Sequence, residues 1–424
     1  MSFGPEELER RKQQRQQYEQ KRRAEQQALK KRLIFAGIAI AATAVIILLA
    51  VLAATNRPEP PAQDTTPSAT GTLPAETEAP DGKTVIHFTA AGDLNISDKV
   101  VQSGGANLDY TDMIADVLPI LAEADLTTIN FEGNFVGPPY GTATSSAPLQ
   151  LLQALKKSGV DMIQMANSRA INNGISGLDT TLKSIRASGI EPLGAYSTNA
   201  EAEKHGGYTI WNARGVRVAV VAFTKGMDNM ALPVGSEKCV NLLYNDYSSR
   251  YVDVNTEAIT NILNRVEKEK PDVTIVLLHW GSEFNDTRST SQNKIRDLLQ
   301  ELGADVIIGT HPHYVQPIEY SESAGTLVAY SLGDFVSDAD RMGTEYGIIL
   351  NVEITKDNAT GETKVTGYEY IPTYSYEDED GMMRVLRIDP AIFAYEFNYL
   401  DKVTKEVYED LKNAKSRIEA RVKP

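Results

Sequence analysis

The chain has 424 residues, of which 42% are hydrophobic and 23% are charged, a composition that allows a large buried core. The formal net charge is −15, and residues 1–32 carry ten basic and five acidic side chains, so residues 33–424 carry a net charge of −20. This negative charge repels the phosphate backbone of nucleic acids, which argues against nucleic acid as a partner. Cys239 is the single cysteine, so no disulfide can form within the chain.

The first 83 residues divide into three segments of different composition. Residues 1–32 are rich in Gln, Glu, Arg and Lys, which predicts a basic cytosolic helix near lipid headgroups. Leu33–Ala54 is uncharged and, as a helix, reaches about 33 Å, enough to cross a hydrocarbon core about 30 Å thick. Its basic N-terminal flank predicts an uncleaved, single-pass signal anchor with the main domain outside the cell membrane. A cleaved signal peptide is the alternative. Residues 55–83 are rich in Pro and Thr, which predicts a disordered linker.

From Thr84 onward, short apolar runs alternate with amphipathic segments, which predicts a layered α/β fold. The predicted strands are Val85–Ala91, Leu126–Phe131, Val160–Met165, Val216–Phe223, Val273–Leu278, Asp305–Gly309 and Leu327–Ser331. The predicted helices are Tyr110–Ala124, Leu149–Ser158, Gly177–Ser188, Thr256–Lys268 and Gln292–Leu302. The main domain is expected to cover residues 84–355, and residues 356–424 are expected to form a C-terminal strand and a helical tail.

Six polar residues stand where predicted strands end, and each has a side chain that can bind a metal. They are Asp93, Glu132, Asn167, His279, His311 and His313. Because strand C-termini in an open α/β sheet meet at one crevice, we expect these side chains to converge. Imidazole nitrogen with carboxylate or amide oxygen is a donor set for a divalent metal. The alternative for any single histidine is a hydrogen-bonded core residue.

His311 and His313 flank Pro312 and are the most informative pair. On an extended chain, residues two apart point the same way, roughly 6–7 Å apart, and a proline favours an extended predecessor. Two imidazoles placed in this way can serve one metal, or one each of two metals about 3.5–4 Å apart. His87 and His205, which lie away from strand ends, are expected to be structural or surface residues.

Six motifs in chain order resemble the CapA-type family of bacterial capsule synthesis and poly-γ-glutamate biosynthesis proteins. They are GDLN (92–95), NFEG (130–133), SGVDMIQMANSRAINNG (158–174), LLHWGSEF (277–284), GADVIIGTHPHYVQP (303–317) and YSLGDFVSD (330–338). The family's domain is similar to calcineurin-like metallophosphatases. The resemblance covers residues 84–355 and implies a metallophosphatase-like four-layer α/β/β/α sandwich. It also implies that the six polar residues bind one or two divalent ions of Mn, Fe or Zn.

The third motif departs from the family pattern. Arg169 stands where the family has His, Ser168 where it has a second Asn, and Asn172 where it has Asp; Asp334 also replaces an Asn later in the chain. In metallophosphatases this His assists proton transfer, which an arginine cannot do at neutral pH, although arginine can bind an oxyanion.

The resemblance places Arg169, Asn167 and His279 at the catalytic positions. Arg169 is expected either to grip a phosphate or carboxylate or to fill the site through a salt bridge to a ligand residue.

Two functions stay open at this point. The first is an extracytoplasmic, metal-dependent hydrolase of phosphoester or amide class, acting on an envelope polymer or its precursor in capsule or poly-γ-glutamate synthesis or export. The second is a non-catalytic component that binds metal or polymer during assembly. In both, the expected partners are the cell membrane through Leu33–Ala54, an envelope polymer and other capsule-synthesis subunits.

Overall fold

The computed structural model describes residues 82–338, 341–397 and 403–424. The predicted cytosolic helix over residues 1–32, the predicted anchor over Leu33–Ala54 and nearly all of the predicted linker lie outside these residues. In the part of the chain that is described, no helix has both the length and the apolar character needed to span a bilayer.

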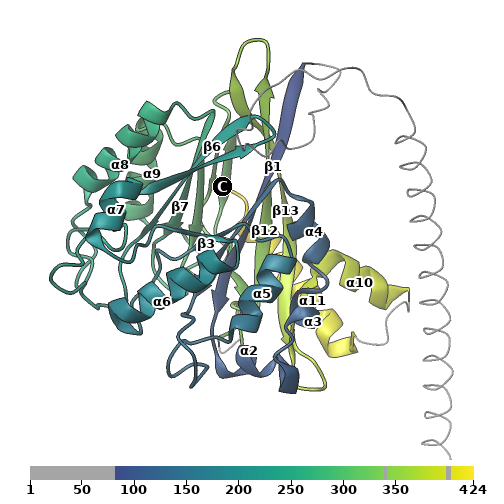
Figure 1. Cartoon of the computed structure of the whole chain (residues 1–424). Coiled ribbons are helices and arrows are strands. Elements are labelled where there is room, and N and C mark those ends of the chain that lie inside the picture. The colour runs from purple at the N-terminus through teal and green to yellow at the C-terminus, as the bar shows by residue number, and fades with distance from the viewer. Residues whose placement is uncertain (1–81, 339–340, 398–402) are drawn as a thin grey trace, which may run out of the picture. The chain divides into compact units, whose positions relative to one another are not determined.

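The described strands form two sheets (Figure 1), and a block of parallel strands reaches one edge of the first sheet and lies in the middle of the second. The eight-stranded sheet has the order β14-β13-β12-β1-β2-β3-β4, with β11 beside β1. Its strands are β1 (Lys83–Asn95), β2 (Leu126–Glu132), β3 (Met162–Gln164), β4 (Glu191–Leu193), β11 (Asp334–Val336), β12 (Tyr346–Asp357), β13 (Thr363–Glu377) and β14 (Met383–Arg387). The six-stranded sheet has the order β5-β6-β7-β8-β10-β9. Its strands are β5 (Tyr208–Ala213), β6 (Val216–Thr224), β7 (Val273–His279), β8 (Val306–Thr310), β9 (Ile318–Ser321) and β10 (Thr326–Ala329).

Helices cover the outer faces of both sheets, while the inner faces pack against each other. Along β6, Val218, Val220 and Ala222 belong to the core shared with the eight-stranded sheet. The alternate residues Ala219, Val221 and Phe223 pack with α8 and α9 on the other side. Figure 1 shows α8 and α9 on one side of the molecule and α10 and α11 on the other. The predicted α/β class is therefore confirmed, with layers in the order helix, sheet, sheet, helix.

Half of the α-helices of the described chain were predicted from the sequence, and those at Asp98–Gln102, Asn199–His205 and Ile388–Glu396 were not. In chain order the described α-helices are α2 (Asp98–Gln102), α3 (Thr111–Ile114), α4 (Leu118–Glu123), α5 (Leu149–Lys157), α6 (Gly174–Ala187), α7 (Asn199–His205), α8 (Thr256–Glu269), α9 (Thr290–Glu301), α10 (Ile388–Glu396) and α11 (Lys405–Arg421). The prediction of one helix over Tyr110–Ala124 is wrong, because α3 and α4 are separate. Pro119 lies in the first turn of α4, where it lacks an N–H and its ring excludes a helical carbonyl at Ala115.

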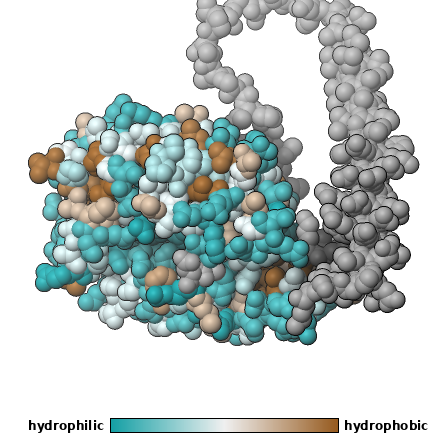
Figure 2. Space-filling view, turned by 90° about the horizontal axis from the view of Figure 1, so that it is seen from below, coloured by the Kyte–Doolittle hydropathy of each residue, from teal (hydrophilic) through white to brown (hydrophobic). Residues whose placement is uncertain are grey.

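The surface carries apolar side chains only in scattered places. The face shown in Figure 2 is mainly hydrophilic, with apolar residues dispersed among polar ones. The exposed large apolar residues of the described chain come from several segments and are Leu149, Val234, Val252, Met342, Tyr368, Phe393 and Phe397. Phe393 and Phe397 contact each other, with ring centroids 4.5 Å apart, and scattered exposed apolar residues are ordinary on protein surfaces.

A glycine in β8 allows two strands and a tryptophan to meet closely beside the site. A Cβ on Gly309 would lie 2.0 Å from the backbone oxygen of Tyr330 and 2.3 Å from Nε1 of Trp280. The same indole nitrogen donates to the Tyr330 carbonyl at 2.9 Å. Gly309→Ala is therefore expected to lower the free energy of unfolding by about 3 kcal/mol, since the backbone must shift and a buried hydrogen bond is lost.

Chemical denaturation of the full chain measures this loss. Gly361→Ala is the matched control, because a Cβ there meets no atom within 4 Å and only the positive φ of 78° is penalised. An equal loss in both variants would show that the contact in β8 is not tight.

Candidate metal centre

The ends of four central strands bring acidic and imidazole side chains together between the two sheets. Asp93 lies near the end of β1, and Glu132 is the last residue of β2, both in the eight-stranded sheet. His279 is the last residue of β7, and His311 directly follows β8, both in the six-stranded sheet. These four side chains are buried, with at most 4% of any residue exposed. The crevice is therefore formed by two sheets rather than by one.

The acidic and imidazole groups form two clusters of three. The first cluster consists of Glu132, His279 and His311, and the second of Asp93, His313 and Asp334. Within each cluster, one potential ligand atom per residue lies within 4.8 Å of the others. Five of the six predicted ligands are thus members of these clusters. Asp334, which the sequence marked only as a departure from the family pattern, is the sixth member.

Two buried ring nitrogens make the first cluster suited to binding a cation. Among the described residues, neither Nε2 of His279 nor Nδ1 of His311 has a hydrogen-bond partner. The other nitrogen of each ring is engaged: Nδ1 of His279 lies 3.3 Å from Thr310 Oγ1, and Nε2 of His311 lies 3.2 Å from Lys225 Nζ. Buried polar atoms without partners are rare in folded proteins. Nε2 of His279 is 3.5 Å from a Glu132 oxygen, so the donor set fits a divalent cation.

Asn130 connects the two clusters and was missed by the sequence analysis. Its Nδ2 donates to Asp93 Oδ1 at 2.5 Å and lies 3.4 Å from a Glu132 oxygen. Asn130 stands two residues before Glu132 on β2, so both side chains project from the same face of the strand. That alternation was the signal available in the sequence.

Asn167 reaches the centre through Asn130 and not through its own carbonyl oxygen. Its Nδ2 donates to Asn130 Oδ1 at 3.1 Å and to the Phe131 carbonyl at 2.8 Å. Its Oδ1 accepts from the backbone N–H of Arg169 at 3.0 Å. Asn167 therefore fixes the position of neighbouring groups in this structure, and its role as a metal ligand stays a prediction.

The prediction that His311 and His313 lie on an extended chain is wrong. Both residues have positive φ, 91° and 58°, and their ring centroids are 6.2 Å apart. The chain turns sharply after β8, where the His311 N–H donates to Asp93 Oδ2 at 3.0 Å. As a result the two imidazoles belong to different clusters. Such backbone conformations are costly for residues with a side chain and concentrate at functional sites.

Burial and mutual charge set the protonation of the centre. Burial raises the pKa of Asp93 well above its usual range, and the nearby Glu132 carboxylate adds to this. Burial, aided by surrounding positive charges, lowers the pKa of His279 and His311 well below the ordinary histidine value. Both rings are therefore neutral, the form that binds metals. Burial alone would lower the pKa of His313, but Asp334, Asp93 and Glu132 together raise it to about 11.

Metal affinity is expected to rise with pH because His313 must give up a proton. With a pKa of about 11, His313 holds its proton at neutral pH and donates from Nδ1 to Asp334 at 2.7 Å. A cation competes with that proton, so affinity should rise roughly tenfold per pH unit between pH 6.5 and 8.5 for each proton released. Calorimetric titration with Mn²⁺ in buffers of different ionisation enthalpy measures this release.

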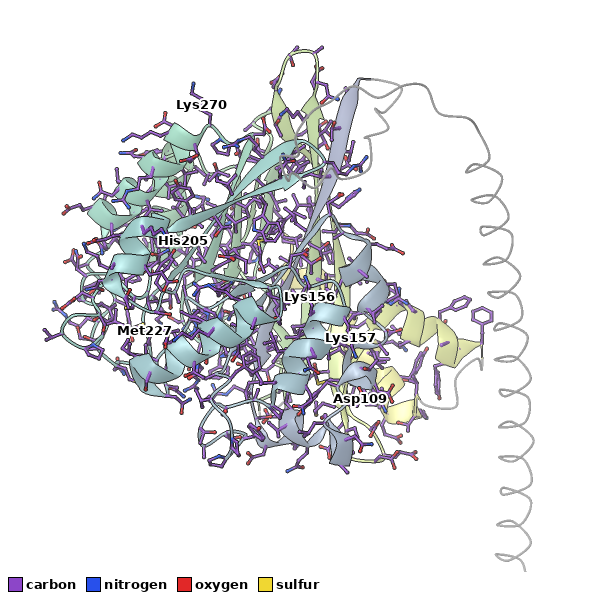
Figure 3. All side chains as sticks on the ribbon, in the orientation of Figure 1. Asp109, Lys156, Lys157, His205, Met227 and Lys270 are labelled. Carbon is purple, nitrogen blue, oxygen red and sulfur yellow. The ribbon has the colours of Figure 1, made fainter. Side chains whose placement is uncertain are left out.

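His313→Gln should weaken Mn²⁺ binding and reduce the proton release by about one. His205→Gln is the matched control and should keep the wild-type slope, because His205 lies on α7 and not among these side chains (labelled in Figure 3). An affinity independent of pH in the wild type would contradict the assignment of His313 as a ligand.

Arg169 lies beside the centre but does not fill it. Its Nη1 pairs with Asp228 Oδ2 at 2.9 Å, and the side chain is 41% exposed. Among the described residues Arg169 pairs with Asp228, which belongs to neither cluster, so the expected alternative of a salt bridge to a ligand residue is not found there. The guanidinium charge still acts on Glu132 and helps to offset the burial that raises the pKa of this carboxyl.

These features define a layered α/β protein with a buried carboxylate and imidazole centre between two sheets. The family described as bacterial capsule synthesis protein PGA_cap matches residues 87–339, and the chain belongs to this family. The match covers six of the seven strands that the sequence predicted and part of the seventh, and it extends over every residue of the two clusters.

The chain is also similar, at low identity, to individual proteins and to solved structures. The chain is 27% identical over 301 residues to the PGA biosynthesis protein CapA of Bacillus subtilis (strain 168), which covers 68% of this chain and 74% of that protein. It is 28% identical over 215 residues to the capsule biosynthesis protein CapA of Bacillus anthracis, covering 51% of this chain and 49% of that protein. Among solved structures, the calcineurin-like phosphoesterase YfkN from Bacillus subtilis aligns at 15% identity with a TM-score of 0.42, over 80% of this chain and 99% of that chain.

Proposed function

We propose that this protein is an accessory protein of capsule or poly-γ-glutamate synthesis or export, and that its inter-sheet centre is a metal-dependent hydrolase site. The observation that carries the proposal is the pair of three-residue clusters. In the first of them, two buried histidine nitrogens have no hydrogen-bond partner among the described residues. Membership of the capsule synthesis family supports an envelope polymer, or its precursor, as the substrate. The scissile bond would be a phosphoester or an amide.

The roles of the residues follow from their contacts. When bound, divalent ions of Mn, Fe or Zn supply Lewis-acid polarisation of the scissile group. Glu132, His279 and His311 would hold one ion, and the cluster of Asp93, His313 and Asp334 would hold a second. Ser168 donates to Glu132 Oε2 at 2.8 Å and so fixes the orientation of that carboxylate.

We further propose that the protein works at the outer face of the cell membrane. The support is the uncharged run Leu33–Ala54 and the basic residues that precede it. A site held outside the membrane would meet a polymer as it is exported, together with other capsule-synthesis subunits. The membrane would be a partner through that helix alone.

A specific observation favours a second candidate function, a non-catalytic binding component. Arg169 cannot transfer a proton at neutral pH, and its guanidinium is paired with Asp228. Metal and polymer would then bind without turnover. Reversion by Arg169→His separates the candidates, since a non-catalytic protein should gain hydrolysis and an adapted hydrolase should lose it.

The proposal is tested with the full chain purified in detergent. Metal content is measured by mass spectrometry, and hydrolysis of bis(p-nitrophenyl) phosphate and of γ-glutamyl oligomers is assayed with Mn²⁺, Fe²⁺ or Zn²⁺. We expect bound metal and metal-dependent turnover of one substrate class. Turnover that persists unchanged in the double variant His311→Ala, His313→Ala would refute a role for these clusters in hydrolysis.

A further inference from the structure

The loop that follows β6 carries two charged residues to the metal centre, and neither belongs to a motif that the sequence marked. Lys225 donates from its backbone N–H to the His279 carbonyl at 2.7 Å. Its Nζ donates to the Gly281 carbonyl at 2.9 Å and lies 3.2 Å from His311 Nε2. The Lys225 ammonium thus contacts His311, a member of the first cluster. Three positions further along the chain, Asp228 pairs with Arg169 at 2.9 Å.

Asp228 sits at the tip of a tight turn that presents its carboxylate. Met230 N–H donates to the Met227 carbonyl at 2.8 Å, and Asp228 and Asn229 have positive φ of 47° and 63°. Met227, the first residue of this turn, is labelled in Figure 3 and is fully buried. Two positive φ values in succession define the type I′ turn, in which Asp and Asn are favoured.

The turn is held in place without help from Arg169. Tyr251 Oη donates to Asn229 Oδ1 at 3.2 Å, and the Tyr251 ring lies under the Lys225 ammonium, 4.5 Å from ring centroid to Nζ. Gly226 packs so closely that a Cβ would come within 2.3 Å of the Tyr247 carbonyl. Because these contacts fix the backbone of the loop, the turn keeps its place whether or not Asp228 is paired with Arg169.

The Arg169–Asp228 pair is easy to break. Both side chains are more than a third exposed, 41% and 37%, and exposed ion pairs of this kind contribute little to stability. Because the pair contributes little, an oxyanion that binds Arg169 can displace the Asp228 carboxylate at low cost. The negative charges that face Lys225 are those of Asp228 and Glu283, so displacing Asp228 leaves the lysine charge less compensated.

We infer that the Asp228 carboxylate is an internal substitute for an oxyanion of the substrate, held by Arg169 beside Lys225 until the substrate displaces it. The guanidinium then binds the phosphate or carboxylate group next to the reacting bond. This assignment deepens the proposed function, since it makes an anionic group adjacent to the metal centre a requirement of the substrate.

The test is a double-mutant cycle between Asp228 and Arg169 in the full chain. Asp228→Asn removes the charge while keeping a residue that tolerates positive φ, and Arg169→Gln removes the guanidinium from a half-exposed position. Binding of inorganic phosphate and of glutarate is measured by calorimetry for all four forms, with Mn²⁺ and after metal removal. We expect Asp228→Asn to tighten binding of one probe by about two- to fivefold, the strength of an exposed ion pair.

In the Arg169→Gln background the same change should have no effect on affinity, and Arg169→Gln alone should weaken binding. Tighter binding of phosphate assigns a phosphoester substrate, and tighter binding of glutarate assigns a carboxylate chain. Unchanged or weaker binding in Asp228→Asn, or an equal gain in both backgrounds, would overturn the inference. If the effects of the two substitutions on anion affinity are coupled but the chain binds no metal, the inference stands and the hydrolase proposal is rejected. If the chain binds metal but the effects are not coupled, the inference is rejected and the hydrolase proposal stands.

Discussion

His311→Ala is expected to remove the metal from the first cluster and to lower metal affinity by at least about 100-fold. Changes to groups that only orient a ligand typically cost 10- to 100-fold, and His311 offers its own unpaired Nδ1. Hydrolysis should fall to the level of the metal-free chain. Calorimetric titration with Mn²⁺, metal content after dialysis and the activity assay each measure the effect.

The control for this variant is His205→Ala, a histidine that is partly exposed at the end of α7. It should retain wild-type metal content and activity. The metal-induced shift in melting temperature is the most direct readout. At a metal concentration of 100 times Kd, the wild type should gain about 2.7 kcal/mol of stability, and His311→Ala should gain almost none. An unchanged shift in His311→Ala would exclude the first cluster as a binding site.

Glu132→Gln is expected to stabilise the metal-free chain and to destroy metal-dependent stabilisation. Glu132 is 4% exposed, and burial raises the pKa of its carboxyl, which means that the ionised form is disfavoured there. A neutral amide of the same shape avoids desolvation of a charge and can still accept the hydrogen bond from Ser168. We expect a gain of about 1–3 kcal/mol in the free energy of unfolding without metal.

The opposite signs make this prediction specific. A residue that only supports the fold would lose stability on replacement in both the metal-free and the metal-loaded chain. Glu132→Gln should instead raise the free energy of unfolding of the metal-free chain and abolish the additional stability that bound metal gives. Urea denaturation with and without Mn²⁺ measures both effects. Glu267→Gln, at an exposed position on α8, is the matched control and should change neither quantity by more than about 0.5 kcal/mol. Destabilisation of metal-free Glu132→Gln would show that the hydrogen bond from Ser168 and the neighbouring positive charges outweigh the cost of burying this carboxylate.

Some residues of the metal centre could be predicted from the sequence, because strand ends and side-chain chemistry are local properties. A buried strand such as β7 is recognised by its apolar run VTIVLL, and His279 at its end is conspicuous for that reason. The same reasoning found Glu132 at the end of β2. Asn130 was missed because an amide within an apolar run has the same pattern whether it is a core residue or part of a site.

Other features depend on contacts between distant segments. The break between α3 and α4 could have been expected from Pro119, since a proline acts on its own helix. The turn at His311 could not, because its positive φ is stabilised by the Asp93 carboxylate, which lies 218 positions away along the chain. The rule that a proline favours an extended predecessor was outweighed by that tertiary hydrogen bond.

The sequence by itself determined the layered α/β class, the identity of most ligand candidates and the substitution of Arg169 for a histidine. These follow from apolar periodicity and from residue types at strand ends, which need no knowledge of the partner segments. Only the tertiary structure decided how the candidates divide into two clusters and that Arg169 pairs with Asp228. The physical reason is that each of these contacts joins residues far apart in sequence, and their distances depend on how two separate sheets pack against each other.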